Sequence, residues 1–285
     1  MTGDYQIRTM SRAELDLAIG WARDEGWNPG LHDATPFHAA DPEGFLVGVL
    51  DGRPISSISV VRYGQTFGFL GLYIVIPEHR RRGYGLRLWQ AGMSRLTGRL
   101  VGLDGVPAQQ DNYRRSGFEL AYRNVRYGGT APAGRTSRTN RTDRLVDARA
   151  VPFEQLLAFD ARFFPAPRPG FLAGWISLPE SSGLAAVEDG ELRGFGVRRR
   201  CRNGHKIGPL YAASRAIAER LFDGLCEGIA GEPVFLDVPE PNLDALALAE
   251  GRDLEPAFET ARMYTGPAPA IERTELYGVT TFELG

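Results

Sequence analysis

Three arginines and two glycines follow an apolar run in this sequence, and together they could hold a phosphate group. Gly71–Ile76 has the β-branched and aromatic composition of a buried strand, and apolar residues recur at helical spacing from Tyr84 onward. The first amides of a helix lack intrahelical acceptors, and the helix dipole places partial positive charge there. Gly83 and Gly85 allow an anion to approach the backbone, and Arg80–Arg82 supply cationic donors. This stretch therefore predicts an anion site between a strand and a helix.

The pattern Arg80-x-x-Gly83-x-Gly85 resembles the pyrophosphate loop of the GNAT superfamily of acetyl-CoA-dependent N-acetyltransferases, whose motif is Gln/Arg-x-x-Gly-x-Gly/Ala. It matches neither the Walker pattern nor Gly-x-Gly-x-x-Gly. The resemblance implies acetyl-CoA as co-substrate, with its phosphates on the loop and its pantetheine and acyl carbonyl on amides of the preceding strand. The cofactor-binding residues that it implies are Tyr73, Ile74, Val75, Arg80, Arg81, Arg82, Gly83, Tyr84, Gly85 and Leu86.

The general acid that the resemblance implies is Tyr113. In the family this tyrosine lies in a short helix, four residues before a Gly-Phe pair, which here is Gly117-Phe118. A leaving thiolate has a reference pKa of about 8.5, so a phenol with a pKa near 10 is a sufficient donor. The chain departs from the family at Val106, where asparagine is frequent. Packing of the short helix onto the sheet is the alternative role for Tyr113.

The group that accepts the proton of the amine is not determined by the sequence. Candidates by location are His32, Asp33, His38, Asp41 and Asp104. For the acceptor we expect Trp27, His32 and Asp33, because the turn-rich loop that contains them could offer a cationic amine an aromatic face and an acid. Lys206, the only lysine, could pair with a substrate carboxylate or be a salt-bridged structural residue. No spacing of histidines, cysteines or acids predicts a metal site.

The elements that must position these residues occur in an order typical of the GNAT fold, over residues 1–129: strand, helix, three strands, helix, strand, helix, strand. Residues 130–150 are rich in Gly, Thr, Ser and Arg and predict a linker. Residues 151–285 repeat the order, and Leu103-Asp-Gly-Val-Pro107 and Leu236-Asp-Val-Pro239 share a motif. The fold class predicted is α/β, with two GNAT-like domains, each a mixed, mostly antiparallel sheet flanked by helices.

The second repeat lacks the phosphate loop. Tyr211-Ala-Ala-Ser-Arg-Ala-Ile stands where the first repeat has Pro77–Gly85, and it has no glycine at the turn. We therefore expect a catalytic first domain and a degenerate second domain that shapes the substrate pocket. The function predicted is transfer of acetyl from acetyl-CoA to a primary amine of a small molecule, by direct attack in a ternary complex. The alternatives are a protein lysine acetyltransferase and a non-catalytic acyl-CoA-binding sensor.

Composition limits the partners. The 285 residues are 43% hydrophobic and 24% charged, with a net charge of −2, which disfavours nucleic acid and anionic membrane as partners. Two cysteines without metal or disulfide spacing suit a reducing cytoplasm, and Met1–Leu15 lacks a signal-peptide core. We expect a cytoplasmic protein, and the sequence does not predict its oligomeric state.

Overall fold

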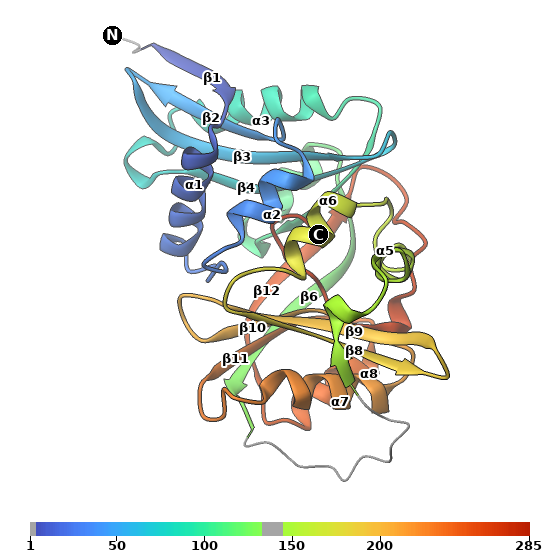
Figure 1. Ribbon diagram of the computed structural model, residues 1–285. Coiled ribbons are helices and arrows are strands. Elements are labelled where there is room, and N and C mark those ends of the chain that lie inside the picture. The colour runs from blue at the N-terminus through green and yellow to red at the C-terminus, as the bar shows by residue number, and fades with distance from the viewer. Residues whose placement is uncertain (1–3, 133–144) are drawn as a thin grey trace.

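The computed structural model describes residues 4–132 and 145–285. Within these residues 13 strands join into one sheet that runs through both halves of the molecule (Figure 1). The strands are β1 (Tyr5–Thr9), β2 (Phe45–Leu50), β3 (Arg53–Tyr63), β4 (Phe67–Val75), β5 (Leu100–Gly105), β6 (Glu119–Thr130), β7 (Leu145–Asp147), β8 (Ser181–Glu188), β9 (Glu191–Arg200), β10 (His205–Ala212), β11 (Pro233–Pro239), β12 (Glu255–Tyr264) and β13 (Leu276–Gly278).

Helices cover the sheet in both halves. The α-helices are α1 (Arg12–Asp24), α2 (Ala34–Ala40), α3 (Tyr84–Arg95), α4 (Gln110–Arg115), α5 (Phe153–Asp160), α6 (Pro169–Trp175), α7 (Arg215–Cys226) and α8 (Leu243–Glu250). The 3₁₀ helices are η1 (Pro77–His79), η2 (Pro107–Gln109), η3 (Ala148–Ala150) and η4 (Arg273–Glu275). The predicted α/β class is confirmed. The predicted order of elements is present in both halves, but α2, α6 and β13 are additional, and β7 lies within residues 130–150, for which the sequence predicts a linker. The capping box of Ser11 and Glu14 at the start of α1 is also present.

The two halves exchange their last long strands. The strand order is β1-β2-β3-β4-β5-β12-β6-β11-β10-β9-β8-β7, with β13 paired to β10. Thus β12, from the end of the chain, lies between β5 and β6 of the first half. Conversely, β6 pairs with β11 of the second half. Only β4 with β5 and β10 with β11 pair in parallel, and the other pairs are antiparallel.

A buried arginine on each exchanged strand pairs with an aspartate of the other half. Arg126 on β6 donates to both carboxylate oxygens of Asp237 on β11, at 2.6 and 2.8 Å. Arg262 on β12 donates to both oxygens of Asp104 on β5, at 2.9 and 2.6 Å. Each arginine is the direct register partner of its aspartate. Asp104 and Asp237 are the aspartates of the shared Leu-Asp motif, so the repeated motif lies at both strand exchanges.

The halves also meet through aromatic packing and through the last residues of the sequence. Helices α2 and α6 lie side by side between the halves (Figure 1). Trp175 of α6 stacks on Phe37 of α2 and on Phe171, with ring centroids 6.1 and 4.9 Å away. After β13 the chain returns to the first half, where the Tyr63 hydroxyl donates to the Leu284 carbonyl at 3.1 Å. Residues 276–285 are buried along their whole length.

The Arg126–Asp237 pair leads to a stability prediction. Replacing Asp237 with Asn leaves the buried Arg126 guanidinium without its anion, and we expect the free energy of unfolding to fall by about 3–5 kcal/mol. Burial opposes ionisation of Asp237, but the charge and hydrogen bonds of Arg126 hold the pKa of this carboxyl below its ordinary value. The stabilisation should therefore be present above the ordinary carboxyl pKa and be lost as the pH falls through the lowered pKa.

Urea unfolding of Asp237→Asn and of a control, Asp223→Asn, measures this effect. Asp223 also receives two hydrogen bonds from an arginine, Arg252, but that pair lies nearer the surface. A partly exposed pair contributes about 0–1 kcal/mol. Equal losses in the two variants would show that the pair between the halves has no special role.

Candidate functional site

The site begins where β4 separates from β5. The two strands pair only from Phe67 to Leu70 on β4, opposite Leu100 to Leu103 on β5. Leu72 then has a φ of 45°, unusual for a buried leucine, and the register of β4 against β3 shifts between Ser57 and Ser59. Beyond this bulge β4 and β5 diverge. The strand before the loop therefore leaves its neighbour several residues before the loop begins.

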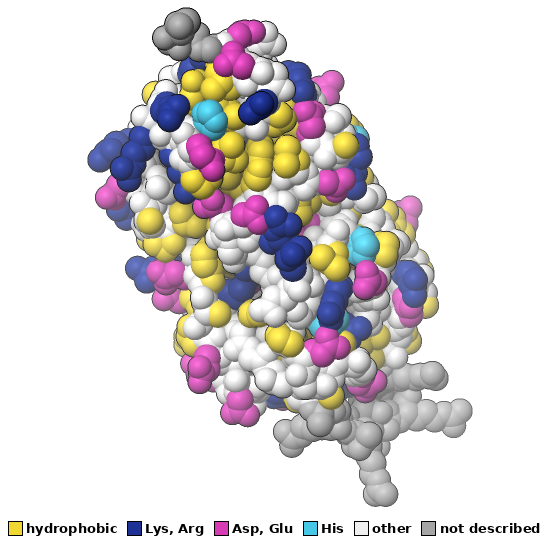
Figure 2. Space-filling view, turned by 90° about the vertical axis from the view of Figure 1, so that its left-hand side faces the viewer, with side chains coloured by type: hydrophobic (Ala, Val, Ile, Leu, Met, Phe, Trp, Pro, Cys, Tyr) yellow, Lys and Arg dark blue, Asp and Glu magenta, His cyan; other side chains and the backbone are white. Residues whose placement is uncertain are grey.

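A cavity of about 630 Å³ opens at this divergence. Its walls come from β4, the loop before α3, the end of β5, α4, the end of α1, β12 and the residues after β13. They include Glu25, Trp27, Tyr73, Ile74, Val75, His79, Arg80, Arg81, Gly83, Gly85, Leu86, Asp104, Val106, Tyr113, Phe258, Thr260, Phe282 and Glu283. On the face drawn in Figure 2, hydrophobic side chains gather in one patch on the N-terminal half, bordered by basic and acidic side chains.

The loop before α3 is shaped by backbone conformations that favour glycine. Gly83 is the N-cap of α3 with a φ of 85° and no side-chain cap, and Arg81 has a φ of 62°. Gly85 must also be small, because a Cβ there would lie 2.8 Å from the Tyr73 hydroxyl. The free amides of the first turn of α3 and the cavity-lining Arg81 thus form a cradle suited to an anion.

The predicted loop residues do not all face the cavity. Arg80 lines it, but its guanidinium donates to the Val75 carbonyl at 2.7 Å and pairs with Glu25, so its head is already oriented. Arg82 is exposed and is not among the cavity-lining residues. Tyr84 also lies off the cavity wall, with its ring 4.7 Å from that of Tyr5. The other predicted cofactor residues line the cavity.

Tyr113 lines the cavity across from the loop before α3, and its ring also packs against neighbouring side chains. Its ring stacks on Trp89 with centroids 5.7 Å apart, and a Cβ at Gly105 would lie 2.3 Å from it. Burial, with a smaller contribution from Tyr73, raises the pKa of Tyr113 to about 12. A phenol with this pKa is protonated at neutral pH, as a proton donor must be, although burial makes it a weaker acid than a free phenol. Tyr73, another cavity phenol, also has a pKa raised to about 12, mainly by burial.

The acceptor-side residues predicted from sequence separate into two groups. Trp27 lines the cavity, whereas His32 and Asp33 do not. His32 pairs with Glu180 at 2.9 Å. Asp33 is fully buried, accepting a hydrogen bond from Arg199 at 3.0 Å and another from the Gly30 amide.

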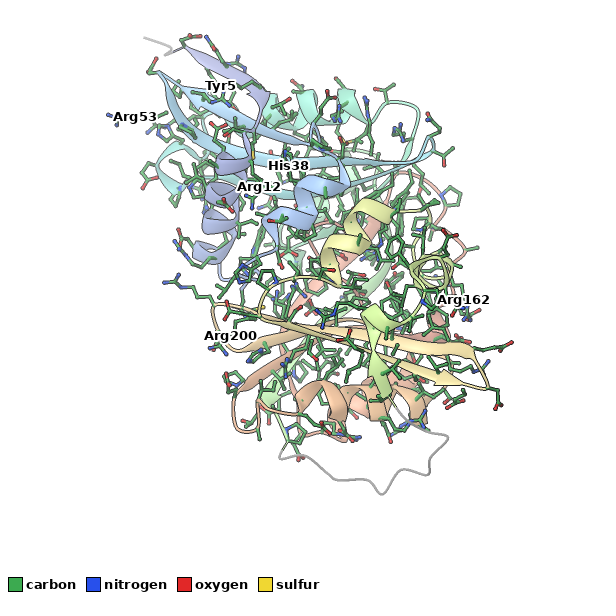
Figure 3. All side chains as sticks on the ribbon, in the orientation of Figure 1. Tyr5, Arg12, His38, Arg53, Arg162 and Arg200 are labelled. Atoms are coloured by element: carbon green, nitrogen blue, oxygen red, sulfur yellow. The ribbon has the colours of Figure 1, made fainter. Side chains whose placement is uncertain are left out.

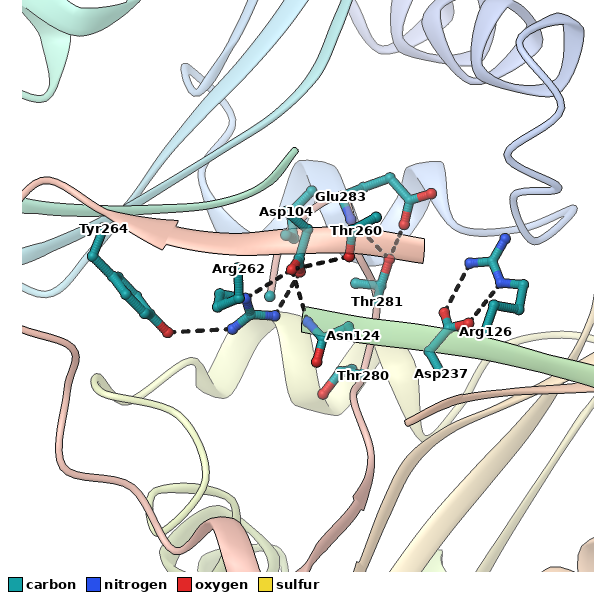
Figure 4. A network of polar contacts seen from close by, with 12 residues as sticks. Asp104, Asn124, Arg126, Asp237, Thr260, Arg262, Tyr264, Thr280, Thr281 and Glu283 are labelled. Atoms are coloured by element: carbon teal, nitrogen blue, oxygen red, sulfur yellow. Dashed lines mark hydrogen bonds and ion pairs between the residues drawn. The ribbon is translucent and has the colours of Figure 1, made fainter. Parts of the chain in front are cut away.

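The remaining candidates for the base are also placed by the structure. His38 lies on α2 (Figure 3), and neither it nor Asp41 lines the cavity. Asp104 does line it, but its oxygens accept hydrogen bonds from Arg262 and, at 2.8 Å, from the Asn124 amide (Figure 4). Asp104 therefore has little capacity left to accept a proton.

Sequence reasoning missed the cavity residues that the second half supplies. Phe258 and Thr260 come from the exchanged strand β12, and Phe282 and Glu283 follow β13. These residues belong to no sequence motif, and they reach the cavity only because the chain crosses from the second half to the first. Lys206 lies nearby, fully buried, and donates to the Trp27 carbonyl at 3.1 Å, but it does not line the cavity.

The equivalent divergence in the second half is filled by the protein itself. β10 pairs with β11 only from His205 to Ile207, as β4 does with β5. Beyond that point β13 pairs with β10, with Leu210 opposite Gly278. The connection from β10 to α7 is only two residues long, whereas β4 and α3 are separated by eight. In the second half the chain thus occupies the space that is a cavity in the first.

Within residues 4–132 and 145–285, no group of three or more histidine, cysteine, aspartate or glutamate side chains is arranged to hold a metal ion. None of the helices described is both long and apolar enough to cross a membrane.

Comparisons with known proteins agree with this geometry. Residues 10–118 match the acetyltransferase (GNAT) family, and residues 156–278 match an acetyltransferase (GNAT) domain. The chain is 32% identical to the holothin acyltransferase of Pseudoalteromonas sp. (strain SANK 73390), over 99% of this chain and 96% of that protein.

Solved structures resemble the whole chain. A putative acetyltransferase from Pyrococcus horikoshii superimposes with a TM-score of 0.82 at 22% identity, over 99% of this chain and 96% of that one. A tandem GNAT protein from the clavulanic acid biosynthesis pathway gives a TM-score of 0.65 at 14% identity, over 93% of this chain and all of that one (100%). The exchange of strands thus occurs in a fold already seen in two-repeat proteins.

The first prediction from this geometry concerns Gly83. Gly83→Val should remove acetyl-CoA binding, because a β-branched residue cannot hold the φ of 85° that shapes the loop and its side chain would occupy the anion cradle. Calorimetry with acetyl-CoA measures the loss. Gly98→Val is the matched control, since Gly98 has a φ of 80° and, like Gly83, has no atom within 4 Å of an added Cβ. If both variants bind equally well, the loop is not the phosphate site.

The second prediction concerns the two cavity phenols. If Tyr113 protonates the leaving thiolate, Tyr113→Phe should lower kcat by about 10²–10⁴ with acetyl-CoA affinity kept. Tyr73→Phe, which removes the other hydroxyl, should keep most of the activity. Steady-state kinetics of thiol release compares them. A wild-type kcat in Tyr113→Phe, or the large loss in Tyr73→Phe instead, would reassign the acid.

Proposed function

Because the chain belongs to the GNAT family of acetyltransferases, we propose that it transfers an acetyl group from acetyl-CoA to a primary amine of a small molecule. The observation that carries this proposal is the cavity, which runs from the loop before α3 to residues supplied by the second half. In this arrangement the loop and the free edge of β4 hold acetyl-CoA. The residues of β12 and those after β13 then wall the acceptor side.

Enclosure by both halves favours a small acceptor over a lysine on a folded protein. Ligand pockets of this size class form preferentially where domains meet, and they bury most of a small ligand. The whole-length likeness to a holothin acyltransferase supports an acceptor that is not a protein. Both repeats and their connection are shared with that relative, so the second half has a counterpart there too.

The acceptor end of the cavity is rich in aromatic side chains. Trp27, Phe258 and Phe282 line it, and the rings of Phe258 and Phe282 lie 6.4 Å apart. The Arg126 guanidinium lies 4.9 Å from the Phe282 ring and 5.6 Å from that of Phe258, which holds both rings in place. Such walls suit an amine with a flat, apolar body better than a polyamine.

The chemistry proposed is direct attack of the amine on the thioester, without an acyl-enzyme. A covalent route needs a reactive nucleophile in the cavity. Cys201 and Cys226 are buried and do not line it. Burial, with a smaller contribution from Asp223, raises the pKa of Cys226 to about 12. Burial also raises the pKa of Cys201.

A panel of acceptors tests the proposal. Thiol release from acetyl-CoA should be fastest with flat amines such as tryptamine or holothin, and slower with spermidine or a lysine peptide. Trp27→Leu should lower kcat/KM for the best amine by about 3- to 10-fold, mainly through KM, since one aromatic contact is lost. Trp21→Leu is the control, because Trp21 is also half-buried but lies off the cavity.

Two outcomes would contradict the proposal. Faster acetylation of the lysine peptide than of every small amine would indicate a protein lysine acetyltransferase. Tight binding of acetyl-CoA without turnover of any amine would indicate a sensor.

A further inference from the structure

Three acidic residues line the cavity, and their carboxylates differ in what they already bind. Glu25 pairs with Arg80. Asp104 is held by Arg262 and Asn124. Glu283 accepts a hydrogen bond from the Thr281 hydroxyl, and no ion pair joins it to a cation within the part of the chain that the structure describes (Figure 4). Among these three, Glu283 is the carboxylate with capacity to accept a proton.

The backbone of Glu283 lies against the point at which β4 leaves β5. A Cβ at Gly71 would be 2.1 Å from the Glu283 carbonyl oxygen, so only glycine allows this approach. The Ser59 hydroxyl also faces that carbonyl, at 3.5 Å. Gly71 directly precedes Leu72, which has a positive φ, and the β4 residues from Leu72 to Val75 line the cavity. Glu283 is therefore fixed beside the segment on which we place the acyl group.

The charged groups around Glu283 each have another partner. Arg126 on β6, Arg199 on β9 and Lys206 on β10 interact with it electrostatically. Arg126 is paired with Asp237 of β11, Arg199 with Asp33, and Lys206 with the Trp27 carbonyl. Three cations thus face three carboxylates, one of which is Glu283. None of the salt bridges among the described residues engages the Glu283 oxygens, so this carboxylate can accept a proton without breaking an ion pair.

We propose that Glu283 is a catalytic residue that accepts the proton of the attacking amine, an inference that rests on the proposed function. The neutral amine nitrogen donates a hydrogen bond to the carboxylate and attacks the thioester carbonyl. As the C–N bond forms, the N–H proton passes to Glu283. As the C–S bond breaks, the thiolate takes the phenol proton of Tyr113. Glu283 then loses one proton to water and Tyr113 regains one, so the net reaction converts amine and thioester to amide and thiol.

Glu283→Gln tests this role while keeping the size of the side chain. We expect kcat to fall by about 10²–10⁴, with acetyl-CoA affinity and melting temperature near those of the wild type. The pH profile gives a readout that a structural role would not change. The rising limb that depends on a carboxylate should disappear, and the residual rate should keep rising with pH as free amine becomes more abundant.

Glu275→Gln is the matched control, because Glu275 lies in the same segment, pairs with Arg162 and is outside the cavity. It should keep wild-type activity. If Glu283→Gln does not bind acetyl-CoA, the Glu283→Asp variant tests the role instead. A lowered kcat with the carboxylate-dependent rising limb of the pH profile retained supports the role of Glu283 as base. A wild-type kcat overturns it.

Different results would overturn the proposed function and the role of Glu283. A wild-type protein that turns over no amine overturns the proposed function, and the role of Glu283 with it. A wild-type protein that is active, with a Glu283→Gln variant of equal kcat and unchanged pH profile, overturns the role of Glu283 alone.

Discussion

Two buried arginine–aspartate pairs determine how this molecule is assembled. Arg262 and Arg126 stand on the strands that the halves exchange, and each finds its aspartate on the strand of the other half. A buried guanidinium without its anion is strongly unfavourable, so each exchanged strand has one register that satisfies both charges. The first of these pairs, Arg262 with Asp104, also forms part of the cavity wall. The fold and one wall of the cavity therefore depend on the same interaction.

The two halves have related sheets but opposite roles. In the first half the strands diverge and leave a cavity, and an eight-residue connection with Gly83 at its end prepares a helix terminus for an anion. In the second half the equivalent divergence receives β13, and the connection is too short for such a loop. The second half instead contributes side chains to the cavity of the first. The cavity described here is thus built by both halves of a duplicated architecture.

Local motifs were sufficient to predict part of this site. The glycines of the loop, the strand before it and Tyr113 are specified by nearby residues, and the structure places them around the cavity as the sequence predicts. Glu283 and Phe282 could not be found in that way, because their position depends on a chain that crosses both halves before reaching Gly71. Asp33 is predicted to face the acceptor, but it does not line the cavity although nearby Trp27 does. Its carboxylate is buried because it accepts a hydrogen bond from Arg199, a residue 166 positions away in the sequence. The strand exchange was equally hidden, since both repeats show the same order of elements whether or not they exchange strands.

The position of β12 also has a consequence for how the protein is made. The strand that completes the edge of β5 is synthesised about 150 residues after β5 itself. At ribosomal rates of about 5–20 residues per second, the first half emerges with an unpaired sheet edge for on the order of ten seconds. Unpaired edges are the segments through which nascent chains associate wrongly. Glycines at both Gly102 and Gly105 make β5 a weak strand until its partner arrives, which limits the hazard during that interval.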